Sequence, residues 1–441
     1  MTITLLRAWT YAAGNKTEDA LKLLKPTGQA QWTKFYKKYH RALIADLGSN
    51  TKTALKEYRG IFKNDPKTLR VALAYARHAA SSRKSKLAKR VLAQHLSQAR
   101  PHPEAKALLD LLNSGKTPGL LVANAEHGLA EVFFGLGDAL TSEGGIDIGT
   151  IYLQFALLLK PDFPLAYASL ANVHEQNKKY QLAIETYDRI PEASPIWRRV
   201  QIRKAFDLNS MDKDDEARTL LVGLLENHPQ EIQILDALGS ILRARKNYKE
   251  AVEFYSRAIA LLKKPEKRDW SYYYARGVCY ERLNLWDNAE TDLEKALELD
   301  PDQPLALNYL GYTWVDQNRR LKRAMAFIRK AVKLKPEDGY FVDSLGWAHY
   351  RLGQHSLAVK HLEKATELRP DDPTINDHLG DAYWRAGRIL EANFQWKQAL
   401  TLMPEPADAE TIAKKLKDGL PDKRQVKEAA ANDNNTNKRK K

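Results

Sequence analysis

One small residue returns at a regular spacing along the chain, amid apolar and polar positions that alternate with helical periodicity. Most steps are 34 residues long, a few are slightly longer, and one gap of 61 residues interrupts the series. A period near 34 residues fits one helix-turn-helix unit, so the pattern predicts eleven such units. The marker positions are Ala20, Ala54, Ala88, Gly149, Ala183, Ala217, Ala251, Ala289, Ala324, Ala358 and Ala392.

Each unit has further small residues and a proline at fixed distances from its marker, most clearly in the unit near residue 350. A glycine, Gly346, precedes the marker by twelve residues, and a second alanine, Ala365, follows it by seven. Small side chains let two antiparallel helices approach closely. Pro370 then ends the second helix, because proline lacks the N–H and clashes with the preceding turn. Asp372 is expected to cap the next helix, with Pro373 at its first position.

Several consecutive units hold small, aromatic, alanine and proline positions in register, as in DSLGWAHYRLGQHSLAVKHLEKATELRP, residues 343–370. This arrangement resembles the tetratricopeptide repeat (TPR) family. The resemblance implies an all-α fold: a TPR α-solenoid, a right-handed superhelix of about eleven helix-turn-helix units. The first three units match it only by spacing and pattern.

The 61-residue gap between Ala88 and Gly149 predicts a degenerate unit, a short helix followed by a Gly/Pro turn, and a hinge. We therefore expect N-terminal basic units over 1–115 and a main array over 116–404. An amphipathic capping helix is expected over 405–420, because the last repeat needs a lid. Residues 421–441 are polar and charged and are predicted to be disordered.

In a TPR hairpin the first helix faces the concave groove, so its inward residues follow spacings of three and four. Aromatic rings there offer rigid contact area, and fixed carboxylates select the charge of a partner. Both tryptophans of this set also fit an interpretation as packing between neighbouring helices. The aspartates argue more strongly for binding, because aspartate has poor propensity inside a helix. The predicted groove wall consists of Asn308, Tyr312, Tyr340, Asp343, Trp347, Tyr350, Asp377, Asp381 and Trp384.

No catalytic constellation is visible, so an enzyme, a cofactor and a metal are not expected. The sequence has no GxSxG, Walker A, GxGxxG or HExxH motif. Asp377 and Asp381 are four residues apart and could share a cation, but His378 is expected to point away from that face. The histidines at 349, 355 and 361 are expected at the surface. Cys279, the single cysteine, is expected to be a small core residue.

The net charge of +15 is concentrated at the two ends. Residues 1–118 hold 23 Lys and Arg against 7 Asp and Glu. Basic and aromatic residues interleave around residues 34–41, which is compatible with binding a single strand by stacking and phosphate contact. No RRM, KH or OB signature accompanies them, so nucleic acid is the alternative partner rather than the expected one.

A closer resemblance covers nearly the whole chain. The segments DQPLALNYLGYTWVDQ and DPTINDHLGDAYWRAGRILEANFQW resemble large TPR proteins of alphaproteobacteria. That resemblance implies an adaptor or scaffold that binds protein partners, among them a cell-envelope protease or a cell-wall hydrolase. Such relatives begin with an export segment, and from its opening residues we expect none in this sequence as written. We therefore expect a cytoplasmic protein as written, or a periplasmic, membrane-associated one if the true start lies upstream; no stretch of the sequence is apolar enough to span a membrane.

Overall fold

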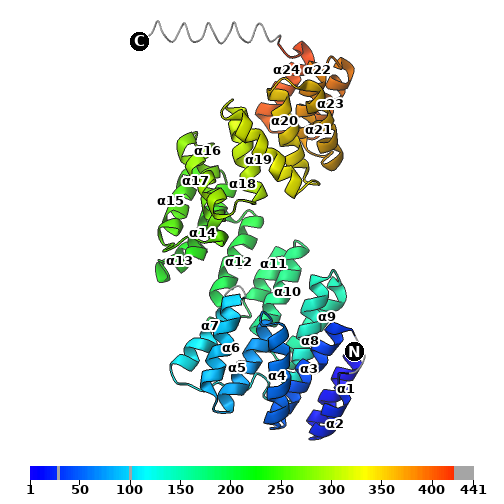
Figure 1. Cartoon of the computed structure of the whole chain (residues 1–441), viewed down its shortest axis with the longest axis vertical. Helices are drawn as coiled ribbons and strands as arrows, with labels where there is room; N and C mark the ends of the chain where they lie inside the picture. The colour runs from blue at the N-terminus through cyan, green and yellow to red at the C-terminus, as the bar shows by residue number, and fades with distance from the viewer. Residues whose placement is uncertain (27–29, 99–101, 422–441) are drawn as a thin grey trace. The chain divides into compact units, whose positions relative to one another are not determined.

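The computed structural model describes residues 1–26, 30–98 and 102–421, which contain 24 α-helices, one short 3₁₀ helix and no strand. Twenty-two of the helices form eleven antiparallel pairs in chain order, which confirms the predicted number of units (Figure 1). The eleven marker residues are all buried, each in the second helix of its pair. The fold class is therefore all-α and built of repeats.

In the N-terminal half the pairs are α1 (Thr2–Ala13) with α2 (Thr17–Leu23), α3 (Gln31–Leu47) with α4 (Thr51–Asn64), α5 (Leu69–Ser81) with α6 (Ser85–Gln98), α8 (Ala125–Ser142) with α9 (Ile146–Leu159), α10 (Pro164–Gln176) with α11 (Tyr180–Tyr187), and α12 (Trp197–Ser210) with α13 (Asp214–Asn227). The remaining pairs are α14 (Ile232–Ala244) with α15 (Tyr248–Ala260), α16 (Trp270–Arg282) with α17 (Trp286–Leu299), α18 (Pro304–Asp316) with α19 (Leu321–Leu334), α20 (Gly339–Arg351) with α21 (His355–Leu368), and α22 (Pro373–Arg385) with α23 (Ile389–Thr401). Two helices stand outside the pairs, α7 (Pro103–Asn113) and α24 (Pro406–Asp418), and η1 (Lys267–Asp269) precedes α16.

The close helix contact, the helix end and the helix cap predicted around residues 346–373 are all present. A Cβ added to Gly346 would lie 2.6 Å from Cγ of Leu362, so α20 and α21 pack too closely there for any larger residue. Helix α21 ends two residues before Pro370. The Asp372 carboxylate accepts hydrogen bonds from the backbone N–H groups of Thr374 and Ile375 at 2.9 and 3.0 Å, capping α22 as predicted.

The turn inside each pair uses a left-handed backbone conformation that the sequence pattern did not mark. Glycine adopts this conformation freely, and asparagine and aspartate tolerate it better than other residues. Four turns nevertheless use serine, lysine or arginine, so the close packing of the two helices outweighs a local cost of roughly 1 kcal/mol. The residues concerned are Asn15, Ser49, Arg83, Gly144, Lys178, Asp212, Lys246, Asn284, Asn318, Gly353 and Gly387.

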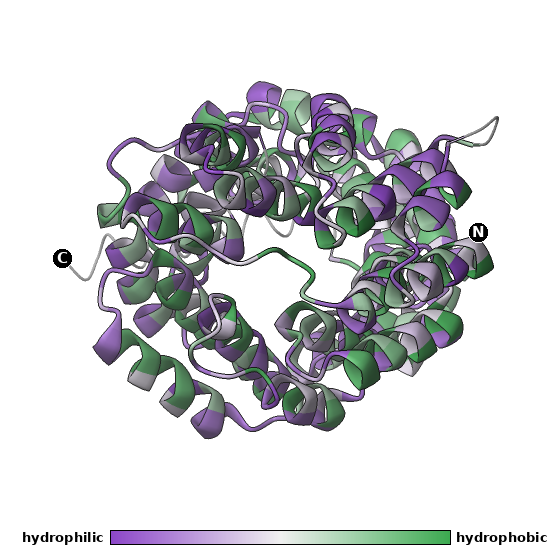
Figure 2. Ribbon diagram, turned by 90° about the horizontal axis from the view of Figure 1, so that it is seen from below, coloured by the Kyte–Doolittle hydropathy of each residue, from purple (hydrophilic) through white to green (hydrophobic). Residues whose placement is uncertain are grey.

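Individual helices carry both hydrophobic and hydrophilic residues, as expected for helices with one packed face (Figure 2). The chain divides into two compact units, Met1–Ala237 and Leu238–Lys441. This division differs from the expected one after residue 115. Helix α8 lies against α1 and α3, and one hydrophobic cluster extends from Leu5 to Leu136, across the predicted hinge. The single helix α7 occupies the predicted degenerate unit.

The predicted capping helix is present as α24, which packs on α23 and buries Ile412. The disorder predicted for the C-terminal tail falls, apart from Pro421, outside the described residues. None of the helices in the described ranges is both long and apolar enough to cross a membrane.

Candidate functional site

The nine residues of the predicted groove wall lie on three successive first helices, α18, α20 and α22, in the second unit. Helix α20 contacts both α18 and α22, so the three helices lie side by side. Asp343 and Asp381 are buried, whereas Tyr340 is 47% exposed and the other six are half-buried. The wall is therefore a surface with buried carboxylates and partly open aromatic rings.

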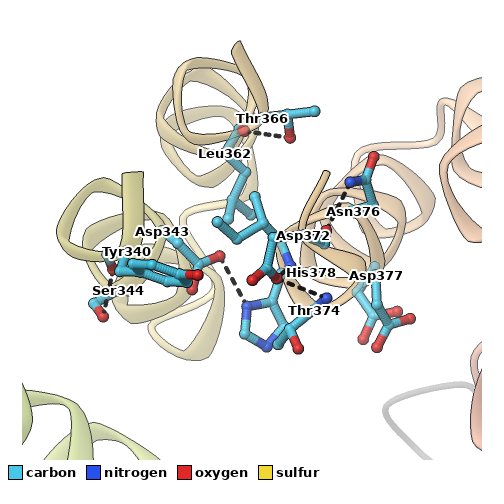
Figure 3. A network of polar contacts seen from close by, with 12 residues as sticks. Tyr340, Asp343, Ser344, Leu362, Thr366, Asp372, Thr374, Asn376, Asp377 and His378 are labelled. Atoms are coloured by element: carbon cyan, nitrogen blue, oxygen red, sulfur yellow. Dashed lines mark hydrogen bonds and ion pairs between the residues drawn. The ribbon is translucent and has the colours of Figure 1, made fainter. Parts of the chain in front are cut away.

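A buried ion pair joins α20 to α22 at the centre of this wall. His378 Nδ1 donates to Asp343 Oδ1 at 2.9 Å (Figure 3). Burial opposes protonation of the imidazole, but Asp343 and the more distant Asp377 and Asp381 outweigh it, so the pKa of His378 is raised. The expectation that His378 points away from Asp377 is correct, as Figure 3 shows, but the histidine is part of the wall rather than outside it.

An aromatic stack is built on this pair. The Trp347 ring lies nearly parallel to His378, with centroids 4.0 Å apart, and to Tyr350 at 4.6 Å. Burial and the charges of the nearby Asp343 and Asp316 raise the pKa of Tyr312. Because Asp343 fixes the histidine and the histidine stacks on the tryptophan, the half-buried rings of Trp347 and Tyr350 are held in place before any partner arrives.

The C-terminal end of the wall is occupied by the chain's own cap. Lys415 of α24 donates to both oxygens of Asp377, at 2.9 and 2.8 Å, and to Asp381 at 2.9 Å. Asp381 also accepts a hydrogen bond from Trp396 Nε1 at 3.0 Å. Burial, only partly offset by Lys415, raises the pKa of Asp381, while the two carboxylates raise the pKa of the lysine against the effect of its burial. The carboxylate pair expected to meet a partner holds the ammonium group of Lys415 instead.

The other wall residues also have partners within the chain. Trp384 packs against Trp396, with centroids 5.4 Å apart, and against the end of α24 at Gly419. Asn308 Nδ2 donates to Ser344 at 3.1 Å, and the Tyr340 hydroxyl accepts from Arg369 at 2.8 Å. The interpretation of Trp384 as a packing residue fits these contacts.

Two further expectations concern residues outside the wall. Cys279 is buried in a hydrophobic cluster, as expected, and burial raises the pKa of its thiol to about 11. His349 is not at the surface: it is buried, and its ring stacks on His361 at 5.3 Å. That prediction was wrong because His349 lies on the face of α20 that packs against α21, where a planar ring fills the space.

Several basic and aromatic residues of α3 are engaged within the fold. Lys37 is buried, and Arg41 pairs with Glu57. The Tyr36 hydroxyl donates to the backbone carbonyl of Gly135 at 2.9 Å, and Tyr39 is buried against Glu131 at 3.3 Å. The two tyrosines hold α3 against α8, so their rings are not available for stacking on nucleic acid bases, whereas Trp32 of the same helix is 58% exposed.

A cavity in the first unit was not anticipated from the sequence. Its volume is about 580 Å³, and α5, α7, α8 and the loops at 114–124, 160–164 and 191–195 contribute to its lining. Among its polar side chains are Arg77 and Lys160. No periodic signal marks these positions, because they meet only where α8 folds back onto the preceding pairs.

Comparison with known proteins supports the repeat assignment. Models described as TPR repeat or tetratricopeptide repeat match residues 134–195, 234–269, 270–303 and 346–387. A TPR repeat-containing protein of Pseudomonas aeruginosa is 28% identical over 198 residues, which are 45% of this chain and 33% of that protein. A UDP-N-acetylglucosamine–peptide N-acetylglucosaminyltransferase of Giardia intestinalis is 38% identical over 101 residues, 22% of this chain and 7% of the enzyme. The chain thus spans a third or less of these relatives.

Among solved structures, the APC/C hetero-tetramer Cut9–Hcn1 aligns with a TM-score of 0.49 at 16% identity. That alignment covers 95% of this chain and 83% of the other.

Proposed function

Because the chain carries tetratricopeptide repeats, which generally mediate protein–protein interaction, we propose that it is a non-catalytic adaptor that binds a partner protein at the groove wall of its second unit. The observation that carries this proposal is the aromatic stack of Trp347 with Tyr350 and His378. Rings that are already fixed lose little conformational entropy when a partner covers them, so their contact area contributes efficiently to affinity.

The aspartates receive a different role from the one expected at first. Asp343, Asp377 and Asp381 each have a cationic partner within the chain, so they position the wall rather than meet a partner's charge. The surface offered to a partner is then the three half-buried rings of Tyr312, Trp347 and Tyr350. An extended segment or a helix with apolar side chains is the occupant that this chemistry favours.

Photo-crosslinking in cells tests the binding surface directly. The photoreactive amino acid p-benzoylphenylalanine replaces Tyr312 in one variant and Phe394 in the matched control. Phe394 is an aromatic residue of α23 that is 65% exposed and lies outside the wall. We expect a discrete set of crosslinked proteins from position 312 that is absent from position 394. The same set from both positions, or none from position 312, would refute the assignment of the wall.

The finer role proposed is presentation of substrates to a cell-envelope protease. It rests on the resemblance of the C-terminal repeats to large TPR proteins of alphaproteobacteria. Mass spectrometry of the proteins crosslinked at position 312 tests it, with nuclease treatment of a parallel sample. Recovery of a protease or a cell-wall hydrolase, unaffected by nuclease, is the expected result. Crosslinked proteins that disappear with nuclease would argue for the nucleic-acid alternative instead.

A further inference from the structure

The cavity of the first unit combines an apolar floor with a rigid rim. Leu73, Leu108 and Leu121 are among its apolar lining residues. Pro191 and Pro195 stand in the loop before α12 and line the same cavity. Proline fixes its own φ and has no N–H to satisfy, so this part of the rim keeps its conformation without a ligand. A volume of about 580 Å³ lies within the range of ligand-binding pockets.

Three side chains that carry hydrogen-bond donors, those of Arg77, Lys160 and Ser194, line this cavity. Arg77 donates through Nη1 to the backbone carbonyl of Gly119 at 2.9 Å, whereas its Nε and the Oγ of Ser194 are buried and have no hydrogen-bond partner among the described residues. Lys160 lies over the Phe163 ring, with Nζ 4.7 Å from the centroid, and forms no ion pair within the described ranges. Buried donors are almost always paired in native proteins, so these two unpaired atoms, with the Lys160 ammonium group beside them, indicate that a ligand supplies acceptors.

The carboxylates nearby are already engaged. Arg70 pairs with Glu131 and lies 3.8 Å from Glu104, so one guanidinium group holds both acids. Asp162, the remaining acid of the lining, is exposed at the mouth of the cavity. Burial is the main reason why the pKa values of Arg77 and Lys160 are lowered, and Arg70 adds to the effect. The nearby carboxylates, Glu131 for Lys160 and Glu104 for both, oppose this lowering without outweighing it. Neither Arg77 nor Lys160 forms an ion pair with a carboxylate within the described ranges, although both line the cavity.

We propose that this cavity binds a short extended segment of a partner protein in which a glutamate or aspartate side chain is flanked by apolar side chains. The carboxylate would accept from Arg77 and Lys160, a backbone carbonyl would accept from Ser194, and the leucine-rich floor would cover the flanking side chains. The site lies in the first unit and is separate from the groove wall, so it does not depend on the function proposed for that wall.

Two synthetic peptides test the chemistry on the full-length chain by isothermal titration calorimetry. One is acetyl-glycine-leucine-glutamate-leucine-glycine-amide, and the other has glutamine in place of glutamate. We expect the glutamate peptide to bind about tenfold more tightly, the effect of one charge-assisted hydrogen bond, and to weaken as salt is added. Equal affinity of the two peptides, or no binding of either up to millimolar concentration, would overturn the proposal.

A pair of lysine variants locates the binding. Lys160→Met removes the ammonium group but keeps an apolar side chain on Phe163. Lys106→Met, the matched control, changes a lysine of α7 that does not line this cavity. We expect Lys160→Met to abolish the preference for glutamate while Lys106→Met leaves it unchanged. Arg77→Leu provides a second variant should Lys160→Met melt at a lower temperature. If both cavity variants keep the full preference, the site lies elsewhere.

Discussion

The buried pair of His378 and Asp343 predicts a stability that depends on pH in a defined direction. The pKa of His378 is raised in the folded chain. The protonated pair therefore stabilises the fold fully below the unfolded imidazole pKa of about 6.5, and this contribution is lost as pH rises through the higher folded pKa. Asp343→Asn keeps the shape of the side chain and a hydrogen-bond acceptor but removes the charge.

The size of the effect follows from the contact. The hydrogen bond is 2.9 Å long, and both side chains are about nine-tenths buried. A buried hydrogen bond to a charged group contributes about 2 kcal/mol, and a neutral one about 1 kcal/mol. Asp343→Asn should thus lower the free energy of local opening of α20 and α22 by about 2 kcal/mol near pH 5.5. Near pH 8.5 the loss should be smaller, because the imidazole gives up its charge as pH rises through the folded pKa of His378.

Hydrogen exchange measured by mass spectrometry reports these opening free energies helix by helix, which suits a repeat protein that need not unfold in one step. The peptides covering α20 and α22 carry the signal, and those covering α15 serve as an internal reference in the same unit. A loss of equal size at both pH values, or one that grows as pH rises, would show that His378 is not protonated beside Asp343.

Three other changes test the packing described above. Gly346→Leu should lower the free energy of unfolding of the second unit by about 2 kcal/mol in urea titration, because its Cβ would overlap Leu362. Gly60→Ala should instead raise the free energy of unfolding of the first unit by up to about 1 kcal/mol, because nothing lies within 4 Å of the added Cβ. Ile412→Ala should cost about 3 kcal/mol of α24 docking, since the side chain is 2% exposed; unchanged hydrogen exchange in α24 would contradict this. Lys415→Met should destabilise the cap by about 3 kcal/mol near pH 7 and by less near pH 4, where one of the two facing carboxyl groups takes up a proton; thermal melts at both pH values distinguish these results.

The repeating part of the fold could be predicted from the sequence because its determinants are local. The close approach at Gly346, the cap at Asp372 and the end of α21 before Pro370 each depend on residues within one or two units. The pairing of Lys415 with Asp377 joins residues 38 positions apart, and nothing in either segment announces the other. The wall residues were placed on the right helices, but their partners were not foreseen.

The cavity of the first unit could not be predicted from the sequence for the same reason. Arg77 and Lys160 come together only because α8 returns to α1 and α3, and the repeat period carries no signal for that return. The buried histidines illustrate the point on a smaller scale. A histidine in the sequence can lie at the surface or in the core. His349 and His378 are buried because a neighbouring helix covers each of them, and the sequence around them does not show this.

The return of α8 also sets an order for events during synthesis. Tyr36 and Tyr39 reach partners 99 and 92 residues further along the chain, so the first three helix pairs leave the ribosome well before the helix that completes their core. Contacts of such long range slow folding and leave apolar surface open in the meantime. In the second unit each pair packs mainly on the next and can consolidate as it emerges. The first unit is therefore synthesised first but completes its core later. It has the greater need of a chaperone while the chain is being made.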